Sequence, residues 1–337
     1  MPQGPVPACD GAMNTTPMMT TTATTPTSSA LPQLGGGLFL ADGGLETSLV
    51  HDDGLDLPDF TTFGLLDTEN GRKVLTDYYE RFVDIASKAG RGIVLETSTW
   101  RISADWLEAQ AYPATDVARL NRAAVDVLLD LRARTPGTTV VLSGCIGPRY
   151  DGYVAEPAPD WKTARDYHAA QVSALAASGV DLVTATTMTT PQEALGIVLA
   201  AKALDVPAVV SFTVETDGRL PDGTSLAAAI VQVDEATAAY PAYYMVNCAH
   251  PQHFQAVVGV GTPGADRIRG VRANASKRSH AELDGATDLD RGDPQDLAQH
   301  YRALLAANPG LAVLGGCCGT NHEHIAAIAA AVTEVRA

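Results

Sequence analysis

The sequence predicts an α/β protein that folds as a single (β/α)8 TIM barrel behind a disordered N-terminal tail. Three observations predict this fold. Eight apolar runs of strand length alternate with longer segments of helical period, as in parallel strands joined by crossover helices. A chain of 337 residues suits one such barrel. Polar and thiol side chains also stand at the ends of several runs, where these barrels carry their active sites.

Residues 1–34 form the expected tail. They contain the threonine-rich stretch TTPMMTTTATTPTSS, several prolines and few large apolar side chains. Such a segment buries too little apolar surface to offset the entropy lost on ordering. We therefore expect the barrel to comprise residues 35–337.

The expected strands follow in order along the chain, separated by helical segments. They cover residues 38–44, 92–100, 138–148, 180–188, 207–214, 240–250, 268–276 and 311–320. The segment 72–90 illustrates the helices, because Val74, Tyr78, Phe82 and Ile85 recur at spacings of three and four residues. A glycine closes that segment, as is common at helix ends.

Charge and hydropathy exclude several classes of partner. Lysine and arginine number 23 against 39 for aspartate and glutamate, which gives a formal charge of −16. Such a field repels phosphate backbones and anionic lipid, so we expect no nucleic-acid or membrane partner. The chain lacks a run of about 18 apolar residues and a basic, apolar N-terminal signal. We expect a cytoplasmic protein, and the sequence leaves its oligomeric state open.

Residues suited to chemistry gather at the expected strand ends. They are Asp42, Glu96, Thr97, Asn247, Cys248, Asn274, Cys317 and Cys318. Successive strand side chains point to opposite faces, so the adjacent cysteines need a sharp turn to reach one point. Gly315, Gly316 and Gly319 would permit that turn through positive φ angles.

The cysteines favour a metal site. In a closed barrel the end of the sixth strand lies two strands from the eighth, so Cys248 can join Cys317 and Cys318. Three thiolates supply three of the four positions of tetrahedral zinc and leave the fourth for water or substrate, as in a catalytic site.

Other arrangements of the same residues remain open. A closed structural site would take its fourth ligand from His250, His322 or His324. A vicinal disulfide between the two adjacent cysteines would need a strained ring and an oxidising compartment. Cys145 is expected to be a small buried hydrophobic residue, and Cys9 an incidental thiol in the tail.

Several motifs together resemble the homocysteine S-methyltransferase family. They are DGG at the first strand, VNC at the sixth, and GGCCGT followed by NHEHI at the eighth. The family includes S-methylmethionine and betaine enzymes and the homocysteine domain of cobalamin-dependent methionine synthase. The resemblance runs from about Leu38 to Val335. It implies that Cys248, Cys317 and Cys318 hold zinc and, through it, activate a thiol substrate.

The implied chemistry suits this ligand set. A free alkyl thiol has a pKa of about 8.5, and only its thiolate is a good nucleophile. Attack of the thiolate on a sulfonium methyl group removes both charges, which a dry site favours. The chain has no room for a cobalamin or folate domain, so we expect a small sulfonium donor, either S-methylmethionine or S-adenosylmethionine. Aromatic side chains at Trp100, Trp106, Tyr150 and Tyr153 would attract that cation.

An amino acid acceptor also needs partners for its negatively charged carboxylate and its positively charged ammonium group. The Gly43 and Gly44 N–H groups would bind its carboxylate, and Asp42 would face its ammonium group. Glu96 is a further candidate at the rim of the barrel. Asn247 is expected to orient the neighbouring cysteine.

The sequence departs from the family pattern at one important position. Related enzymes commonly carry a glutamate after the fourth strand that pairs with the homocysteine ammonium group, and here that position falls on Thr186. A hydroxyl cannot replace this charge. Glu46, in DGGLET, would supply the missing charge. The segment ANASKRSHAELD after the seventh strand departs as well.

The sequence thus predicts a zinc-dependent enzyme that methylates homocysteine to methionine from a sulfonium donor. Within the same class, the alternative is a different acceptor thiol, a selenol or another donor. A non-catalytic zinc-binding barrel is the alternative from a different class. A zinc hydrolase is disfavoured, because three thiolates make the metal less acidic toward water.

Overall fold

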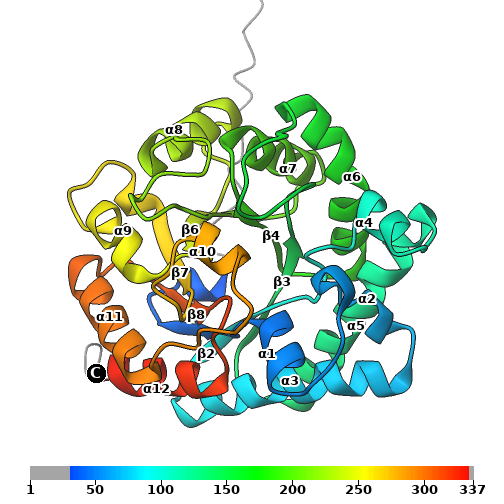
Figure 1. Cartoon of the computed structure of the whole chain (residues 1–337), viewed down its shortest axis with the longest axis horizontal. Coiled ribbons are helices and arrows are strands. Elements are labelled where there is room, and N and C mark those ends of the chain that lie inside the picture. Colours follow the sequence, from blue (N-terminus) through cyan, green and yellow to red (C-terminus); the bar gives the residue numbers. More distant parts are fainter. Residues whose placement is uncertain (1–30, 334–337) are drawn as a thin grey trace, which may run out of the picture.

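The computed structural model describes residues 31–333. They form a closed barrel of eight parallel strands in sequential order, surrounded by helices (Figure 1). The strands are β1 (Phe39–Ala41), β2 (Gly92–Glu96), β3 (Val140–Ile146), β4 (Leu182–Met188), β5 (Ala208–Phe212), β6 (Tyr243–Asn247), β7 (Ile268–Ala273) and β8 (Val313–Gly316). Each lies inside the corresponding predicted run. The predicted fold class is therefore confirmed.

The helices follow the strands as a (β/α)8 fold requires. They are α1 (Leu45–His51), α2 (Phe63–Leu66), α3 (Glu69–Lys88), α4 (Ala104–Ala109), α5 (Val117–Arg134), α6 (Trp161–Ser178), α7 (Pro191–Ala203), α8 (Leu226–Thr237), α9 (Pro251–Val258), α10 (His280–Asp284), α11 (Pro294–Ala307) and α12 (His322–Thr333). No helix in this described part of the chain is long and apolar enough to cross a bilayer.

Helix α3 shows how local sequence sets these elements. The Thr68 side chain accepts a hydrogen bond from Gly71 N and caps the helix. The helix begins at Glu69, three residues before the start of the predicted segment. Tyr78 and Phe82 are 1% exposed, whereas Val74 and Ile85 pack at the edge of the core. The apolar face read from the sequence is therefore the face that packs on the barrel.

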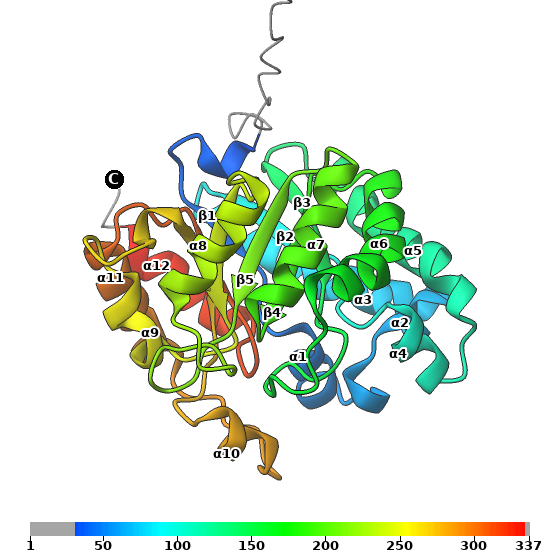
Figure 2. The ribbon, with the colours of Figure 1, turned by 90° about the horizontal axis from the view of Figure 1, so that it is seen from above.

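An inner apolar cluster fills the barrel below the site. Val94, Val141, Leu182 and other inward side chains form it, and Leu31 packs against them. Figure 2 shows the first described residues, in blue, at one end of the barrel and α10 projecting from the other.

The assignment of residues 31–34 to a disordered tail is wrong. Pro32–Leu34 form a 3-10 turn, Leu31 is 5% exposed, and the buried Gln33 donates from Nε2 to the Tyr243 hydroxyl at 3.3 Å. These side chains are ordered because they cover the apolar end of the barrel interior. Residues 1–30 of the predicted tail lie outside the described residues.

Replacement of Leu31 tests this packing. We expect Leu31→Ala to lower the free energy of unfolding by about 2–3 kcal/mol, because it opens a void against the inner cluster. Urea unfolding of both proteins would measure the change. Leu34→Ala, at a more exposed position of the same turn, should cost less. Equal midpoints for wild type and Leu31→Ala would show that the turn does not dock on the barrel.

Candidate metal centre and substrate cavity

Three cysteine sulfurs converge at the carboxyl ends of the strands. Cys248 follows β6, and Cys317 and Cys318 follow β8. Their Sγ atoms all lie within 4.8 Å of one another, and those of Cys248 and Cys318 are 3.9 Å apart. The structure therefore brings together the three residues that the sequence predicts to act together.

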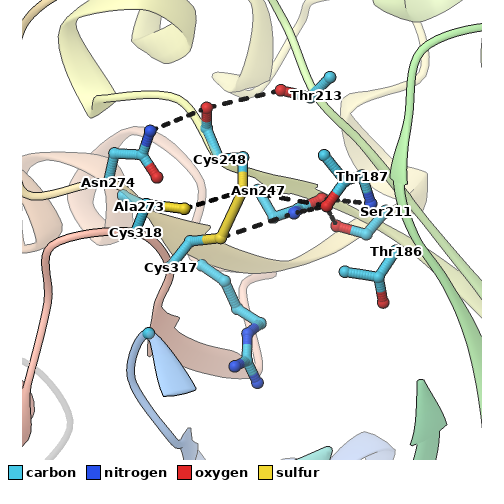
Figure 3. The surroundings of a disulfide bond; sticks show 12 residues. Thr186, Thr187, Ser211, Thr213, Asn247, Cys248, Ala273, Asn274, Cys317 and Cys318 are labelled. Atoms are coloured by element: carbon cyan, nitrogen blue, oxygen red, sulfur yellow. Dashed lines mark hydrogen bonds between the residues drawn. A yellow bond between two sulfur atoms is a disulfide. The ribbon is translucent and has the colours of Figure 1, made fainter. Parts of the chain in front are cut away.

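The sulfurs of Cys248 and Cys317 are joined as a disulfide, which Figure 3 shows beside the free Cys318. From the sequence we considered only a vicinal disulfide between Cys317 and Cys318. The two joined residues are 69 positions apart in sequence, and their Cα atoms lie 5.4 Å apart, within the usual range for disulfides.

Glycines and one unusual cysteine conformation make this convergence possible. Gly319 has φ +79, as predicted, but Gly315 and Gly316 remain in or beside β8 without positive φ. Gly316 is needed for space, since an added Cβ would lie 2.0 Å from Thr320 Oγ1. Part of the left-handed turning expected of the glycines occurs instead at Cys248, with φ 53.

Hydrogen bonds hold the Cys248 backbone in that conformation. Its carbonyl oxygen accepts from Asn274 Nδ2 at 3.0 Å and from His280 Nε2 at 2.8 Å. The Thr213 hydroxyl approaches the same oxygen at 3.5 Å. Three partners at one carbonyl offset the cost of positive φ at a residue that has a side chain.

Asn247, which was expected to orient the neighbouring Cys248, instead contacts Cys317 and links it to β4 and β5. Its Nδ2 donates to Thr187 Oγ1 at 2.8 Å and points to Cys317 Sγ at 3.8 Å (Figure 3). Its Oδ1 accepts from Ser211 Oγ at 2.6 Å and from Thr187 N at 3.1 Å. Thr187 was missed by the sequence analysis. Its φ of 63 is rare for a β-branched residue and marks a local strain at the site.

No histidine in the described part of the chain joins the cysteine group. The side chain of His250 caps α9 by accepting from Gln252 N, and His324 bonds Asn321 and the Arg291 carbonyl. His322 is exposed at the start of α12. In the described part of the chain, the closed site with a histidine ligand is therefore not formed.

A second group of metal-type side chains lies between α9 and α11, where His250 approaches Asp296 and His300. Two features argue against an ion there. Lys277 Nζ is already paired with Asp296 at 2.7 Å. His250 Nδ1 accepts a backbone hydrogen bond, which leaves the proton of the neutral ring on Nε2 and so occupies both ring nitrogens.

The cysteines form part of the wall of a cavity of about 400 Å³. Most of the predicted substrate contacts line the same cavity, namely Asp42, Gly43, Gly44, Glu46, Glu96, Trp100 and Thr186. Asn247 lies outside this lining. Trp106 and Tyr150 also do not line it, whereas Tyr153 does. The predicted aromatic surface is therefore reduced to Trp100 and Tyr153.

Two expected substrate contacts are already used within the protein. Gly44 N donates to the Thr320 carbonyl at 3.0 Å, so it does not offer its N–H to a substrate carboxylate. The Asp42 carboxylate accepts from Arg272 Nη1 at 2.7 Å. Closure of the barrel brings β7 and β8 against the loop after β1, so the Gly44 N–H already has a partner. The contact of Asp42 with a substrate ammonium group stays a prediction, because the ion pair with Arg272 uses only Oδ1.

Arg272 was not singled out from the sequence. It lies on β7, is 6% exposed and lines the cavity. Its Nη1 is 2.7 Å from Asp42 Oδ1 and 3.8 Å from Glu96 Oε2. A signal was present, since Arg269 and Arg272 are three positions apart in one strand run, so one of them faces the barrel interior and needs a buried partner.

Burial alters the ionisation of the groups in the cavity. It raises the pKa of Cys318, so this thiol stays protonated at neutral pH unless a metal binds it. Burial also raises the pKa of Tyr153, whose hydroxyl therefore remains protonated and donates toward Cys318 Sγ at 3.5 Å. Burial raises the pKa of Cys145, a cavity-lining thiol outside the cluster. The pKa of Glu46 rises to about 7 for the same reason.

Comparison with known proteins identifies the family. Residues 39–332 match the family model described as homocysteine S-methyltransferase. The chain belongs to the homocysteine S-methyltransferase family. This confirms the resemblance carried by the DGG, VNC and GGCCGT motifs.

Similar proteins in this family span nearly the whole chain. The chain is 25% identical over 322 residues to homocysteine S-methyltransferase 3 of Zea mays, covering 87% of this chain and 89% of that protein. Homocysteine S-methyltransferase 2 of Zea mays matches at the same identity and coverage.

Solved structures of the homocysteine methyltransferase MmuM from Escherichia coli are similar in fold. The oxidised form matches with a TM-score of 0.70 and 21% identity, covering 87% of this chain and 95% of that one. The metallated form matches with a TM-score of 0.68 and 22% identity, covering 87% and 96%. At these identities the likeness establishes the fold alone.

Thr186, where the sequence departs from the family pattern, lies close to a carboxylate of β2, two strands away in the barrel. Thr186 Oγ1 lies 3.4 Å from Glu96 Oε1, so a carboxylate from β2 reaches across to the side chain on β4. Cys145 Sγ lies 3.5 Å from the same hydroxyl. The cavity thus retains a carboxylate near the position where the family pattern has a glutamate.

The raised pKa of Glu46 predicts a pH effect on stability. Because its pKa is about 7 in the folded protein against 4.5 for an exposed glutamate, its ionisation opposes folding as pH rises between these values. We expect the free energy of unfolding of Glu46→Gln to equal that of wild type near pH 4 and to be higher than that of wild type above pH 7. With partial solvent exposure taken into account, the gain should be about 1–2 kcal/mol. Urea unfolding at both pH values measures it, and a difference independent of pH would contradict the assignment.

Proposed function

We propose that this enzyme transfers a methyl group from a sulfonium donor to the thiol of homocysteine, using zinc held by Cys248, Cys317 and Cys318. One observation carries the proposal. Three sulfur atoms converge on the wall of a cavity, and no histidine of the described chain completes a closed ligand set around them.

The donor set suits zinc. With zinc–sulfur bonds of about 2.3 Å, tetrahedral geometry separates sulfur atoms by about 3.8 Å. The Cys248 and Cys318 sulfurs lie 3.9 Å apart, and Cys317 completes the trio once its disulfide is reduced. Bound zinc would ionise a coordinated thiol at neutral pH, which a buried thiol does not achieve alone.

The protein side chains would then hold and shield the reactants. The acceptor thiolate attacks the methyl carbon of the sulfonium, a carbon–sulfur bond forms, the donor carbon–sulfur bond breaks, and two neutral thioethers result. Trp100 and Tyr153 line the cavity. Their rings would stabilise the cation and exclude water, which favours a reaction that removes charge.

The size of the cavity bears on the donor. About 400 Å³ lies near the lower end of the range for ligand pockets and must accommodate both reactants. S-Methylmethionine, which lacks an adenosyl group, suits this space better than S-adenosylmethionine. We therefore propose S-methylmethionine as the principal donor.

The acceptor end of the cavity offers two carboxylates in place of the family glutamate. Glu46 lies in the first turn of α1, and Glu96 ends β2. Both line the cavity. Because Thr186 stands where the family has a glutamate, a second candidate function remains, in which the acceptor is a small thiol other than homocysteine. Comparison of acceptor thiols separates these two candidates.

The three cysteines also bear on the cellular compartment, because they bind a metal only as free thiolates. Free thiolates require a reducing compartment, which favours the cytoplasm. We propose that the barrel and its short N-terminal turn form one domain that carries the whole site, with homocysteine and the sulfonium donor as its small-molecule partners.

Loss of one sulfur tests the metal centre. We expect reduced wild type to bind one zinc per chain and to form methionine from homocysteine and S-methylmethionine. Cys317→Ala should lose zinc and lower turnover by at least 1000-fold. Cys145→Ala is the matched control, because Cys145 lines the cavity outside the cluster and should leave zinc content unchanged. Zinc content by elemental analysis and methionine by chromatography give the two readouts. Full zinc in Cys317→Ala would refute the ligand assignment.

Replacement of Asn247 tests how the sulfurs are oriented. Asn247→Ala removes the contact to Cys317 and the bonds to Thr187 and Ser211. We expect zinc affinity to fall about 10- to 100-fold, as when residues that orient metal ligands are lost. Competition with a chromogenic chelator measures the affinity. An unchanged affinity would mean that the cysteine loops orient themselves without this amide.

A further inference from the structure

The segment ANASKRSHAELD, which departs from the family pattern, brings a histidine against the cysteine cluster. His280 opens α10, the helix that projects from the barrel in Figure 2. Between Lys277 and Asp290, a range that the structure describes in full, His280 is the one buried residue, with 6% of its surface exposed. A buried polar side chain needs hydrogen-bond partners. Those of His280 lie at the ends of two barrel strands.

The imidazole ring of His280 joins α10 to the loops after β5 and β6. Its Nε2 lies 2.8 Å from the Cys248 carbonyl oxygen, and its Nδ1 lies 3.1 Å from Glu215 Oε1. A carbonyl oxygen only accepts hydrogen bonds, so Nε2 carries a proton and donates to it. The bond from Asn274 to the same oxygen is longer, at 3.0 Å. His280 is therefore the nearest hydrogen-bond donor to the backbone of a cluster cysteine.

The backbone conformation of Cys248 makes this contact important. Its φ of 53 lies in the left-handed region, which is disfavoured for a residue that has a Cβ atom. Without partners for its carbonyl oxygen, we expect the Cys248 backbone to relax toward a right-handed conformation. That change would redirect the Cα–Cβ bond and move the Cys248 sulfur, which now lies 3.9 Å from Cys318 Sγ. The hydrogen bond from His280 thus bears on where the sulfur points.

The face of the same ring supports a neighbour of another cysteine. The His280 and Tyr153 rings are stacked, with centroids 4.2 Å apart and an angle of 14° between their planes. The Tyr153 hydroxyl lies 3.5 Å from Cys318 Sγ. His280 itself is not among the residues that line the cavity. One imidazole therefore contacts supports of two cluster cysteines from outside the cavity.

We propose that His280 is a positioning residue for the metal centre, which holds Cys248 in the left-handed conformation that directs its sulfur toward Cys317 and Cys318. This inference rests on the function proposed above, which gives the three sulfurs a common metal. His280 acts through the Cys248 carbonyl, while its stacking on Tyr153 keeps the ring in the plane that this hydrogen bond requires. It is neither a metal ligand nor a substrate contact.

Helix α10 has supports that do not involve the His280 side chain. Ser279 and Glu282 form a capping box at its first turn, in which each side chain bonds the backbone of the other residue. His253 Nε2, on α9, lies 3.1 Å from the Lys277 carbonyl oxygen and anchors the chain just before the helix. Replacement of the imidazole can therefore remove the contact to Cys248 while the segment stays in place.

Two replacements of His280 separate its hydrogen bond from its ring. Phenylalanine keeps an aromatic ring and has no donor, whereas glutamine has no ring and carries an N–H donor at a reach similar to that of Nε2. We expect His280→Phe to lower the zinc affinity of the reduced protein about 10- to 100-fold, as when residues that orient metal ligands are lost. His280→Gln should restore most of that affinity. Competition with a chromogenic chelator measures it.

His253→Ala is the matched control. It removes the other histidine that anchors this segment, and His253 bonds the Lys277 carbonyl rather than a cysteine. Its zinc affinity should equal that of wild type. Urea unfolding of the zinc-free proteins measures stability separately. A merely structural role for His280 would lower stability and zinc affinity together in both of its variants, without rescue by glutamine.

The outcomes distinguish this inference from the proposed reaction. Unchanged zinc affinity in His280→Phe, or an equal loss in the phenylalanine and glutamine variants, would overturn the inference even if wild type forms methionine normally. Loss in His280→Phe with rescue in His280→Gln would support it even if wild type forms no methionine, a result that would refute the reaction alone. A reduced wild type that binds no zinc would overturn both.

Discussion

The parallel pairing of β1 with β8 closes the barrel, and the whole site depends on that closure. Phe39 pairs with Val313 and Leu40 with Leu314. The loops that follow these two strands then meet, where Gly44 N donates to the Thr320 carbonyl and Gly316 N to the Asp42 carbonyl. The Arg272–Asp42 ion pair spans 230 positions of sequence. Such non-local contacts form only when the ring of strands is complete, so the site is a product of the global fold.

The sequence was sufficient for the architecture and for the cysteine cluster. Strand and helix periods recur eight times with little interruption, and each period depends only on local spacing. The cysteines were identifiable because thiols are rare in this chain and stand at strand ends, where closure of a barrel makes distant residues neighbours. Asn247 followed from its position beside one of those thiols.

The remaining features depend on contacts that local patterns do not encode. Whether the Gly44 N–H is free, whether Asp42 has a partner, and where His250 points are all decided across the barrel. Arg272 is the clearest example. Its ion-pair partners, Asp42 and Glu96, can be identified only when the side chain on β7 is known to reach the ends of β1 and β2. The tail boundary failed for a related reason, because Leu31 is stabilised by strands that come later in the chain.

The apolar cluster that fills the lower barrel, covered by Leu31 and Gln33, also determines how molecules reach the site. It closes the barrel beneath the cavity, so both reactants must enter and leave past the loops on the side of α10. Ligands of the cavity therefore exchange with solvent at one end of the barrel only. A plug that lies far from the cysteines thus determines which loops a ligand has to pass.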